Sequence, residues 1–300
     1  MQHHFLNFPY CFNSACSCRN MKAQPECFPC FLRQALQAAK FSSLSEDIQK
    51  RILQEVMEKL LKEDWNKTPP ELAHIAHAVV RKYARGDPYA KVKKESNDLA
   101  LSMYPELKKI VEKSDNPLRT AVRIAIAGNI IDFGALDSFD VKKTLDDVLR
   151  RKFRYDDFEK FKKDLERGKR ILYFADNAGE IVFDKLLIET IREMKDYQIT
   201  LVVKEGPIIN DATLEDAKYT GIDKIVDEIR FIGNGEVGIE RNSPEVGQWI
   251  KEHDVIISKG QGNCEGLSEF RGIFYLLMIK CPVIARYLNG NVGDIILLYR

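Results

Sequence analysis

Short apolar runs rich in β-branched residues alternate with helical segments in the C-terminal part of the chain, and this alternation limits the fold more than any other feature. The runs occupy residues 171–175, 199–203, 229–232, 254–258 and 282–286, with a possible sixth at 294–299. Continuous apolar runs of this length are typical of strands covered on both faces, and the helices between them allow parallel connections. Residues 166–300 are therefore predicted to form an α/β domain with a mainly parallel, doubly wound sheet.

The region before this sheet, residues 21–165, has a helical period instead. Ser45 is placed to cap one amphipathic segment, and a second segment runs between Pro69 and Gly86. A third segment at 116–134 is apolar on most sides, so it should form a buried helix. No strand is expected here, and the prediction is an all-helical N-terminal domain.

The overall charge gives no reason to expect a nucleic-acid or membrane partner. Lys and Arg number 46 and Asp and Glu number 45, so the net charge is +1. No apolar run is long enough to cross a bilayer, and residues 1–20 lack the pattern of a signal peptide. We interpret residues 1–20 as an N-terminal extension, with Met21 a plausible true start, and expect a cytoplasmic protein with reduced cysteines.

Acidic and amide side chains follow the first two predicted strands. Asp176 and Asn177 end the first run, and Asp211 lies shortly after the second. Ligands of open α/β sheets bind at the carboxyl ends of the strands. Carboxylate and amide oxygens suit Mg²⁺, Mn²⁺, Co²⁺ or Ni²⁺, so these three residues are candidate ligands of a divalent metal ion.

A lysine and a glycine-rich turn follow the fourth predicted strand. Lys259 is a candidate point charge for a phosphate, and the backbone N–H groups after it are a candidate anion-binding nest. The turn consists of Gly260, Gln261, Gly262 and Asn263. A divalent ion, a lysine and a nest together indicate phosphoryl transfer.

Each of these residues also has a purely structural interpretation. Asn177 and Glu180 have the spacing of a capping box, and Asp211 can cap a helix that begins near Thr213. Lys259 can be solvated, and its glycines can simply form a turn. The functional hypothesis rests on all of them occurring at one end of one sheet.

Two other motifs suggest different chemistry. Residues 233–238, GNGEVG, match a dinucleotide-binding fingerprint, but no helix opens within the motif, so we interpret it as a loop. The stretch around Asp176 also resembles the first motif of haloacid-dehalogenase-like phosphatases. Those enzymes carry a second Asp two positions later, where this chain has Ala178.

Cys27 and Cys30 form a C-x-x-C pair with two interpretations. With His74 and His77 they have the residue types of a zinc site, but both histidines fall on the polar face of their helix, which favours solvation. The other interpretation is two small buried thiols. Cys264 lies within the glycine-rich turn and is not assigned a catalytic role.

The ordered set of motifs resembles the metal-dependent damage-control phosphatases, in particular their stand-alone subtype with a C-x-x-C pair. The matching stretches are ECFPCFLRQA, GNIIDFG, FADNAGEIVFDK, NDAT followed by DA, KGQGNCEGL and CPVIA, which together span residues 26–285. The resemblance implies a helical domain on a Rossmann-like domain, with the active site between them. It also implies that Asp176, Asn177 and Asp211 bind the metal.

The resemblance extends the phosphate site as well. Lys259 and the turn after it would hold the phosphate, and Asn129 and Asp132 would reach in from the helical domain. Spacing alone favours a helix C-terminus at Gly128 and Asn129 instead.

We therefore expect a metal-dependent phosphatase that hydrolyses small phosphorylated metabolites, such as sugar phosphates or damaged phosphometabolites. The expected catalytic residues are Asp176 and Lys259. The alternatives are a haloacid-dehalogenase-like aspartyl-phosphatase and a non-catalytic metabolite- or zinc-binding module.

Overall fold

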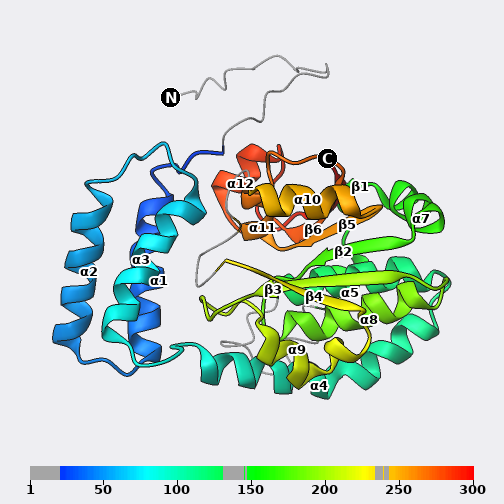
Figure 1. Ribbon diagram of the computed structural model, residues 1–300, viewed down its shortest axis with the longest axis horizontal. Helices are drawn as coiled ribbons and strands as arrows, with labels where there is room; N and C mark the ends of the chain where they lie inside the picture. The colour runs from blue at the N-terminus through cyan, green and yellow to red at the C-terminus, as the bar shows by residue number, and fades with distance from the viewer. Residues whose placement is uncertain (1–20, 131–144, 146, 234–238, 240–242) are drawn as a thin grey trace, which may run out of the picture.

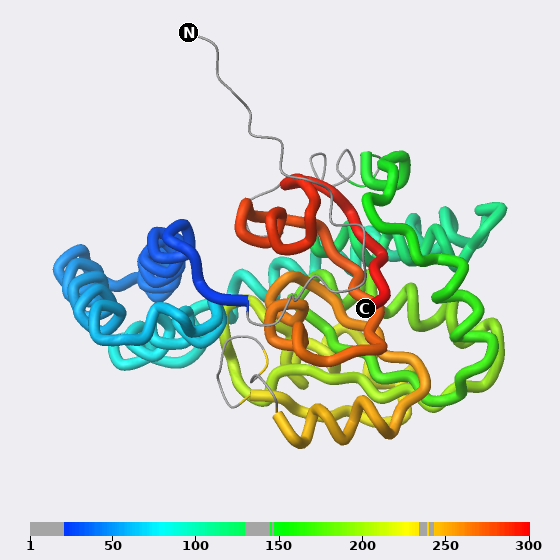
Figure 2. Tube along the Cα trace, turned by 90° about the horizontal axis from the view of Figure 1, so that it is seen from above, coloured from blue at the N-terminus to red at the C-terminus, as the bar shows by residue number. Residues whose placement is uncertain are grey.

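The computed structural model describes residues 21–130, 145, 147–233, 239 and 243–300. Figure 1 shows two parts, a bundle of three helices and a larger unit built on one sheet. The bundle consists of α1 (Cys27–Phe41), α2 (Glu46–Leu60) and α3 (Pro69–Tyr83). Its helices share a core of their own that includes Phe31, Val56 and Leu72. Figure 2 shows the same separation from above, with the bundle lying to one side of the sheet.

Local sequence explains where the bundle helices start. Thr68 and Glu71 form a capping box at the start of α3, with Pro69 in its first turn. Ser45 lies at the N-cap position of α2, as predicted, although its side chain makes no capping hydrogen bond. The amphipathic segments of the sequence are thus the helices of the bundle.

The sheet has seven strands in the order β1-β7-β6-β5-β2-β3-β4. Neighbouring strands are parallel except for β6 and β7, which are antiparallel. The strands are β1 (Phe153–Asp156), β2 (Arg170–Phe174), β3 (Gln198–Lys204), β4 (Glu228–Ile232), β5 (Val255–Lys259), β6 (Ile273–Met278) and β7 (Ile295–Tyr299). The predicted mainly parallel α/β sheet is confirmed.

Helices cover both faces of the sheet (Figure 1). One layer contains α4 (Ala90–Glu112), α5 (Pro117–Ile130), α7 (Phe158–Arg167), α8 (Glu180–Arg192) and α9 (Leu214–Thr220), followed by a 3-10 turn (Ile222–Lys224). The other contains α10 (Pro244–Glu252), α11 (Gln261–Gly266) and α12 (Pro282–Tyr287). A separate buried core lies under each layer, which explains why the strands are apolar on both sides.

Three sequence-based predictions about elements are wrong. Residues 282–286, predicted as a strand, form most of α12, because Pro282 follows an extended N-cap residue and starts a helix. The strand of this region is β6, at Ile273–Met278, which begins nine residues before the predicted one. The third difference is β1, a strand within the region expected to be all helical, which pairs with β7 at the edge of the sheet.

The buried cores divide the chain differently from the predicted boundary at residue 165. Leu107 of α4, Ala125 of α5 and Phe161 of α7 belong to the same core as Ile171 of the sheet. Among the described residues, α1–α3 supply most of a separate core, to which Tyr89 and Val283 also belong. We therefore propose a division after α3 in place of residue 165.

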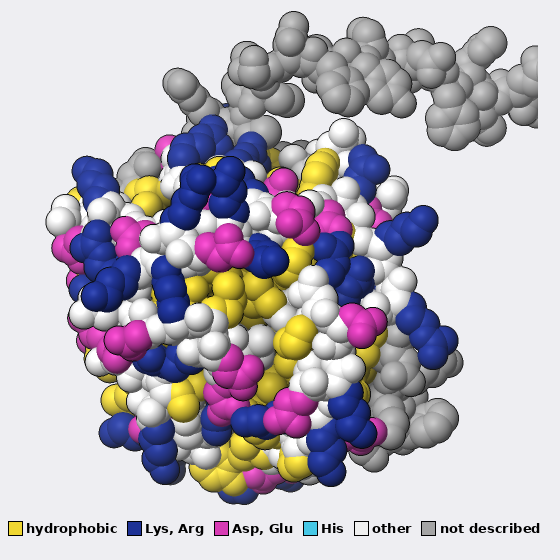
Figure 3. All heavy atoms as spheres, turned by 90° about the vertical axis from the view of Figure 1, so that its right-hand side faces the viewer, with side chains coloured by type: hydrophobic (Ala, Val, Ile, Leu, Met, Phe, Trp, Pro, Cys, Tyr) yellow, Lys and Arg dark blue, Asp and Glu magenta, His cyan; other side chains and the backbone are white. Residues whose placement is uncertain are grey.

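The surface agrees with the balanced composition. On the face opposite the bundle, basic and acidic side chains are interspersed around a strip of apolar ones (Figure 3). No helix of the described residues is both long and apolar enough to span a bilayer.

Candidate functional site

The predicted metal ligands lie side by side at the carboxyl ends of β2 and β3. Asn177 and Asp211 form an antiparallel β-bridge. Two backbone hydrogen bonds flank it, from Ala178 N to Asn210 O and from Ala212 N to Asp176 O, each 2.8 Å long. The bridge fixes the segments that carry all three side chains against each other, which the sequence could not show.

The carboxylate of Asp176 is held by two amides and a glycine. Asn129 Nδ2 and Asn177 Nδ2 donate to Asp176 Oδ2 at 2.9 and 2.7 Å. Gly260 packs directly against this carboxylate, since a Cβ there would lie 1.9 Å from Asp176 Oδ2. Gly260 also has φ +76°, a conformation that favours glycine. Only a glycine satisfies both conditions.

Asn129, which lies on α5, donates to the Asp176 carboxylate, and its contact with the substrate stays a prediction. The helix continues to Ile130, so Asn129 is not the C-cap that spacing alone favoured. Close packing of α5 on α8 makes the hydrogen bond to Asp176 possible, because a Cβ at Gly128 would lie only 2.8 Å from the ring of Phe183. Asp132 lies outside the described residues.

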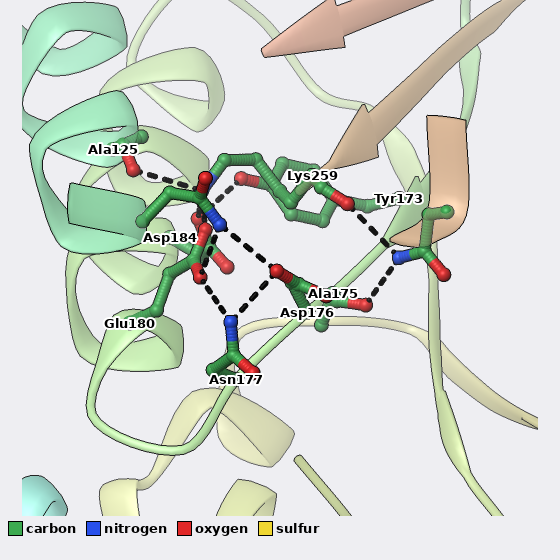
Figure 4. A network of polar contacts seen from close by, with 10 residues as sticks. Ala125, Tyr173, Ala175, Asp176, Asn177, Glu180, Asp184 and Lys259 are labelled. Atoms are coloured by element: carbon green, nitrogen blue, oxygen red, sulfur yellow. Dashed lines mark hydrogen bonds and ion pairs between the residues drawn. The ribbon is translucent and has the colours of Figure 1, made fainter. Parts of the chain in front are cut away.

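Glu180 is a site residue that the sequence interpretation missed. The proposed capping box is wrong, since α8 begins at Glu180 after the N-cap Gly179 and the Glu180 side chain is fully buried. Its Oε2 accepts hydrogen bonds from Asn129 Nδ2 and Asn177 Nδ2, both at 3.1 Å. The two amides therefore bridge the carboxylates of Asp176 and Glu180. Figure 4 shows this arrangement for Asn177.

The structure gives Lys259 a different environment from the predicted one. Its ammonium group is completely buried and donates to Ala125 O at 2.8 Å and to Glu180 Oε1 and Asp184 Oδ1 at 2.6 Å each. Asp184 Oδ1 also accepts from Tyr173 Oη at 2.8 Å. These three contacts use the three N–H bonds of the ammonium, so Lys259 anchors the carboxylates beside the site (Figure 4).

The residues after Lys259 form the first turn of α11. Asn263 Nδ2 donates to Ala175 O at 2.9 Å and to Lys259 O at 3.0 Å, which links the ends of β2 and β5. Gln261 Nε2 donates to Glu265 Oε1 at 3.3 Å. A Cβ at Gly262 would meet no heavy atom within 4 Å, so there is open space beside this residue.

Burial shifts the pKa of the carboxylates of the site, upward for Asp176 and Asp211. Burial, followed by repulsion from Glu180 and Asp211, raises the pKa of Asp176 well above its ordinary value. Burial raises the pKa of Asp211 to about 6, although Lys204 and Lys93 oppose the rise. Burial would also raise the pKa of Glu180, but the charges of Lys259 and Lys280 and the hydrogen bonds from Lys259 and Asn129 together hold the value below normal.

These features fit a divalent cation. Two half-buried carboxylates with raised pKa values, Asp176 and Asp211, lie on the segments that the β-bridge joins, and Lys204 Nζ is 3.8 Å from Asp211 Oδ2. Asn129 Oδ1 is buried and has no hydrogen-bond partner among the described residues. A hard cation would satisfy such oxygens. Within the described ranges no three His, Cys, Asp or Glu side chains form a metal-binding group. The candidate ligands proposed here are two carboxylates, Asp176 and Asp211, and one amide, Asn177.

The structural alternatives for the other residues are also resolved. Asp211 caps no helix, because α9 has Thr213 as its N-cap residue, in a capping box with Asp216. His77 is buried, with Nε2 3.1 Å from Gln34 Oε1, so its predicted solvation is wrong. The GNGEVG segment, apart from Gly233, lies outside the described residues.

Comparison with known proteins identifies the family. The model of the damage-control phosphatase ARMT1-like domain matches residues 23–296. A protein of Archaeoglobus fulgidus named damage-control phosphatase is 38% identical over 288 residues, covering 92% of this chain and 98% of that protein. A damage-control phosphatase of Pyrococcus horikoshii is 34% identical, covering 92% and 97%.

The fold agrees with this assignment. The crystal structure of a DUF89 family protein from Pyrococcus horikoshii superimposes with a TM-score of 0.84 at 34% identity, covering 93% of this chain and 99% of that one. A third relative, an uncharacterised protein of Methanocaldococcus jannaschii, is 36% identical, covering 94% of this chain and 96% of that protein. The chain therefore belongs to the damage-control phosphatase ARMT1-like family.

Proposed function

We propose that this protein is a metal-dependent phosphatase that hydrolyses phosphate monoesters of small metabolites, namely sugar phosphates or damaged phosphometabolites. The observation that carries the proposal is the β-bridge that joins Asp176 and Asn177 to Asp211 at the end of the sheet. Family membership supports it, since relatives over most of this chain are named damage-control phosphatases. We propose the cytoplasm, where such metabolites are made, as its location.

In this proposal Asp176, Asn177 and Asp211 hold the ion through their side-chain oxygens. The Nδ2 of Asn177 now donates to Asp176, so a rotation of the Asn177 amide would present its oxygen instead. Mg²⁺, Mn²⁺, Co²⁺ and Ni²⁺ all suit such oxygen ligands. A bound divalent ion would polarise the phosphate and lower the pKa of a bound water.

The neighbouring residues position these ligands. Asn129 holds Asp176 and Glu180 together, and Lys259 holds Glu180 from behind. Because the Lys259 ammonium is buried and fully bonded, we propose that it acts through Glu180 and does not touch the phosphate. This revises the role that the sequence interpretation gave to Lys259.

We assign the phosphate contact to the backbone N–H groups of residues 261–263, since the Gly260 N–H already donates to Leu276 O at 3.3 Å. The Gln261 and Asn263 side chains bond to protein groups, whereas the space beside Gly262 is open. Backbone N–H groups at the start of a helix attract anions. The roles of Asn129 and Asp132 in holding substrate stay predictions.

Phosphate release from a panel of sugar phosphates tests the proposed function. The protein is freed of metal with a chelator and resupplied with each of the four ions, alongside Asp211→Asn. Asp196→Asn, the same substitution at an exposed position before β3, serves as the control. We expect turnover only with added metal, retained in Asp196→Asn and reduced at least a hundredfold in Asp211→Asn.

Two results would contradict the proposal. Equal turnover by Asp211→Asn and the wild type would remove Asp211 from the site. Detection of a phosphorylated Asp176 by mass spectrometry after acid quenching would favour the aspartyl-phosphatase alternative instead.

A further inference from the structure

Three cysteines gather where the helical bundle meets the sheet unit, away from the strand-end carboxylates. Cys27 is the first residue of α1 and is buried, and Cys30 lies one turn further along. Cys281 is the N-cap residue of α12 and packs against the core of the bundle, to which Cys27 belongs. An ion pair of 2.8 Å between Glu26 and Arg286 joins the start of α1 to the last turn of α12.

A buried acid lies beside these thiols. Gln261 Nε2 donates both to Cys281 Sγ, at 3.4 Å, and to Glu265 Oε1, at 3.3 Å. Glu265 is only 8% exposed. Burial raises its pKa to about 8, with only the Gln261 amide opposing the rise. Such a carboxyl group can exchange a proton with a neighbouring thiol near neutral pH.

The arrangement favours Cys281 over Cys30 as the partner of Cys27. Cys281 packs against the apolar core that contains the buried Cys27, whereas Cys30 is not part of that core. The sulfur of Cys30 instead accepts from Arg33 and Gln34, each at 3.5 Å, on the next turn of α1.

We propose that Cys27 and Cys281 form a reversible disulfide that joins α1 to α12 when a small disulfide such as oxidised glutathione is present. The Cys281 thiolate, which is partly exposed, attacks the small disulfide and releases one glutathione thiolate. The Cys27 sulfur then attacks Cys281 Sγ and releases the second, while Glu265 takes the Cys27 proton. The two protein thiols lose two electrons, and these reduce one oxidised glutathione to two thiols.

This bond would couple the redox state to the candidate site. Gln261 links Cys281 to the first turn of α11, and Gly260 at the start of that turn packs against Asp176. A covalent bond between α1 and α12 would fix the helical bundle against this turn. The inference does not depend on the proposed phosphatase activity.

Peptide mapping tests the disulfide directly. The reduced full-length protein is incubated with oxidised glutathione, its free thiols are alkylated, and it is digested with trypsin. Cleavage after Lys22 and Arg33 gives a peptide with both Cys27 and Cys30, and cleavage after Lys280 gives one with Cys281 alone. We expect peptides 23–33 and 281–286 to be linked, and dithiothreitol to separate them.

Variants identify the sulfur atoms and control for folding. The link should persist in Cys30→Ser and in Cys264→Ala, which changes another buried cysteine, and disappear in Cys27→Ser and Cys281→Ser. The oxidised wild type should melt roughly 5 °C above the reduced form, as expected for a disulfide that closes a long loop. Circular dichroism confirms that each variant is folded.

Several outcomes would overturn the proposal. A lone peptide 23–33 that is two hydrogens lighter would mean a Cys27–Cys30 bond. Absence of any link in folded, oxidised protein would remove the disulfide altogether. Stoichiometric zinc in the freshly purified protein, lost in Cys281→Ser, would make the cluster a metal centre instead.

Discussion

Gly260 and Gly262 are two residues apart in the same turn, yet they serve opposite purposes. A Cβ at Gly260 would collide with Asp176, whereas a Cβ at Gly262 would enter open space. We expect Gly262→Ala to leave the fold intact or stabilise it by about 0.5–1 kcal/mol, since it removes a helical glycine. Its kcat/KM should nevertheless fall at least roughly tenfold, because the new methyl group occupies the proposed phosphate position.

Gly260→Ala is the matched substitution. It should destabilise the protein by at least about 1–2 kcal/mol, because Gly260 has a positive φ and packs directly against the Asp176 carboxylate. Chemical unfolding and initial-rate kinetics measure both variants. If Gly262→Ala kept full activity, the phosphate would have to bind elsewhere.

The role of Lys259 can be tested through its partners. Lys259→Met leaves Glu180 and Asp184 buried without their cation, so we expect a loss of stability of about 3–5 kcal/mol. Adding Asp184→Asn should recover part of this loss, because one uncompensated charge is removed. Urea unfolding of the two single variants and the double variant gives the coupling. Additive effects would contradict a shared network.

Among single residues, the sequence identified those that follow strands and missed those inside a helix. Asp176 and Asp211 stood out because strand ends meet at one edge of a sheet. Glu180 and Asp184 are four residues apart, a spacing that amphipathic helices often show, and nothing local distinguishes them from solvated acids. Only the position of α8 under Lys259 reveals their role.

At the level of helices, His77 makes the bundle sensitive to acid. It is buried between α3 and α1, and burial, followed by the charges of Arg81 and His74, lowers its pKa from 6.5 to about 4. A depressed histidine pKa means that the folded state holds the neutral ring, so its stabilisation is complete above pH 6.5. It declines as the pH falls from 6.5 towards 4, by up to about 3 kcal/mol.

His77→Gln should remove this dependence. The variant keeps a hydrogen-bonding side chain opposite Gln34 but has no proton to gain. Urea unfolding at pH 7.5 and pH 5 compares the two proteins. We expect the wild type to lose more stability than His77→Gln between these values, and equal losses would show that another group is responsible.

The strands were predictable where a β-branched run was clearly bounded by helical segments on both sides. Five strands coincide with such runs and were predicted, namely β2, β3, β4, β5 and β7. β6 was missed because IFYLLM is buried almost throughout and lacks the alternation that separates a strand from a buried helix. β1 was missed because it is short and alternates Phe and Tyr with charged residues at the sheet edge.

For the whole molecule, the proposed site depends on parts that are far apart in the sequence. α5 supplies Asn129, β2 and β3 lead to the carboxylates, and β5 ends at Lys259. The resemblance of motifs predicted that these parts act together. The bridging of Asp176 and Glu180 by the amides of Asn129 and Asn177 depends on side-chain packing, which no local sequence pattern predicts.

Calorimetric titration of the metal-free protein with Mn²⁺ tests the central claim most directly. The account predicts one site per chain, with an affinity at least a hundredfold weaker in Asp211→Asn and unchanged in the control Asp196→Asn. Binding of one Mn²⁺ with equal affinity to the wild type and to Asp211→Asn would contradict it, because the ion would then lie away from the ends of β2 and β3.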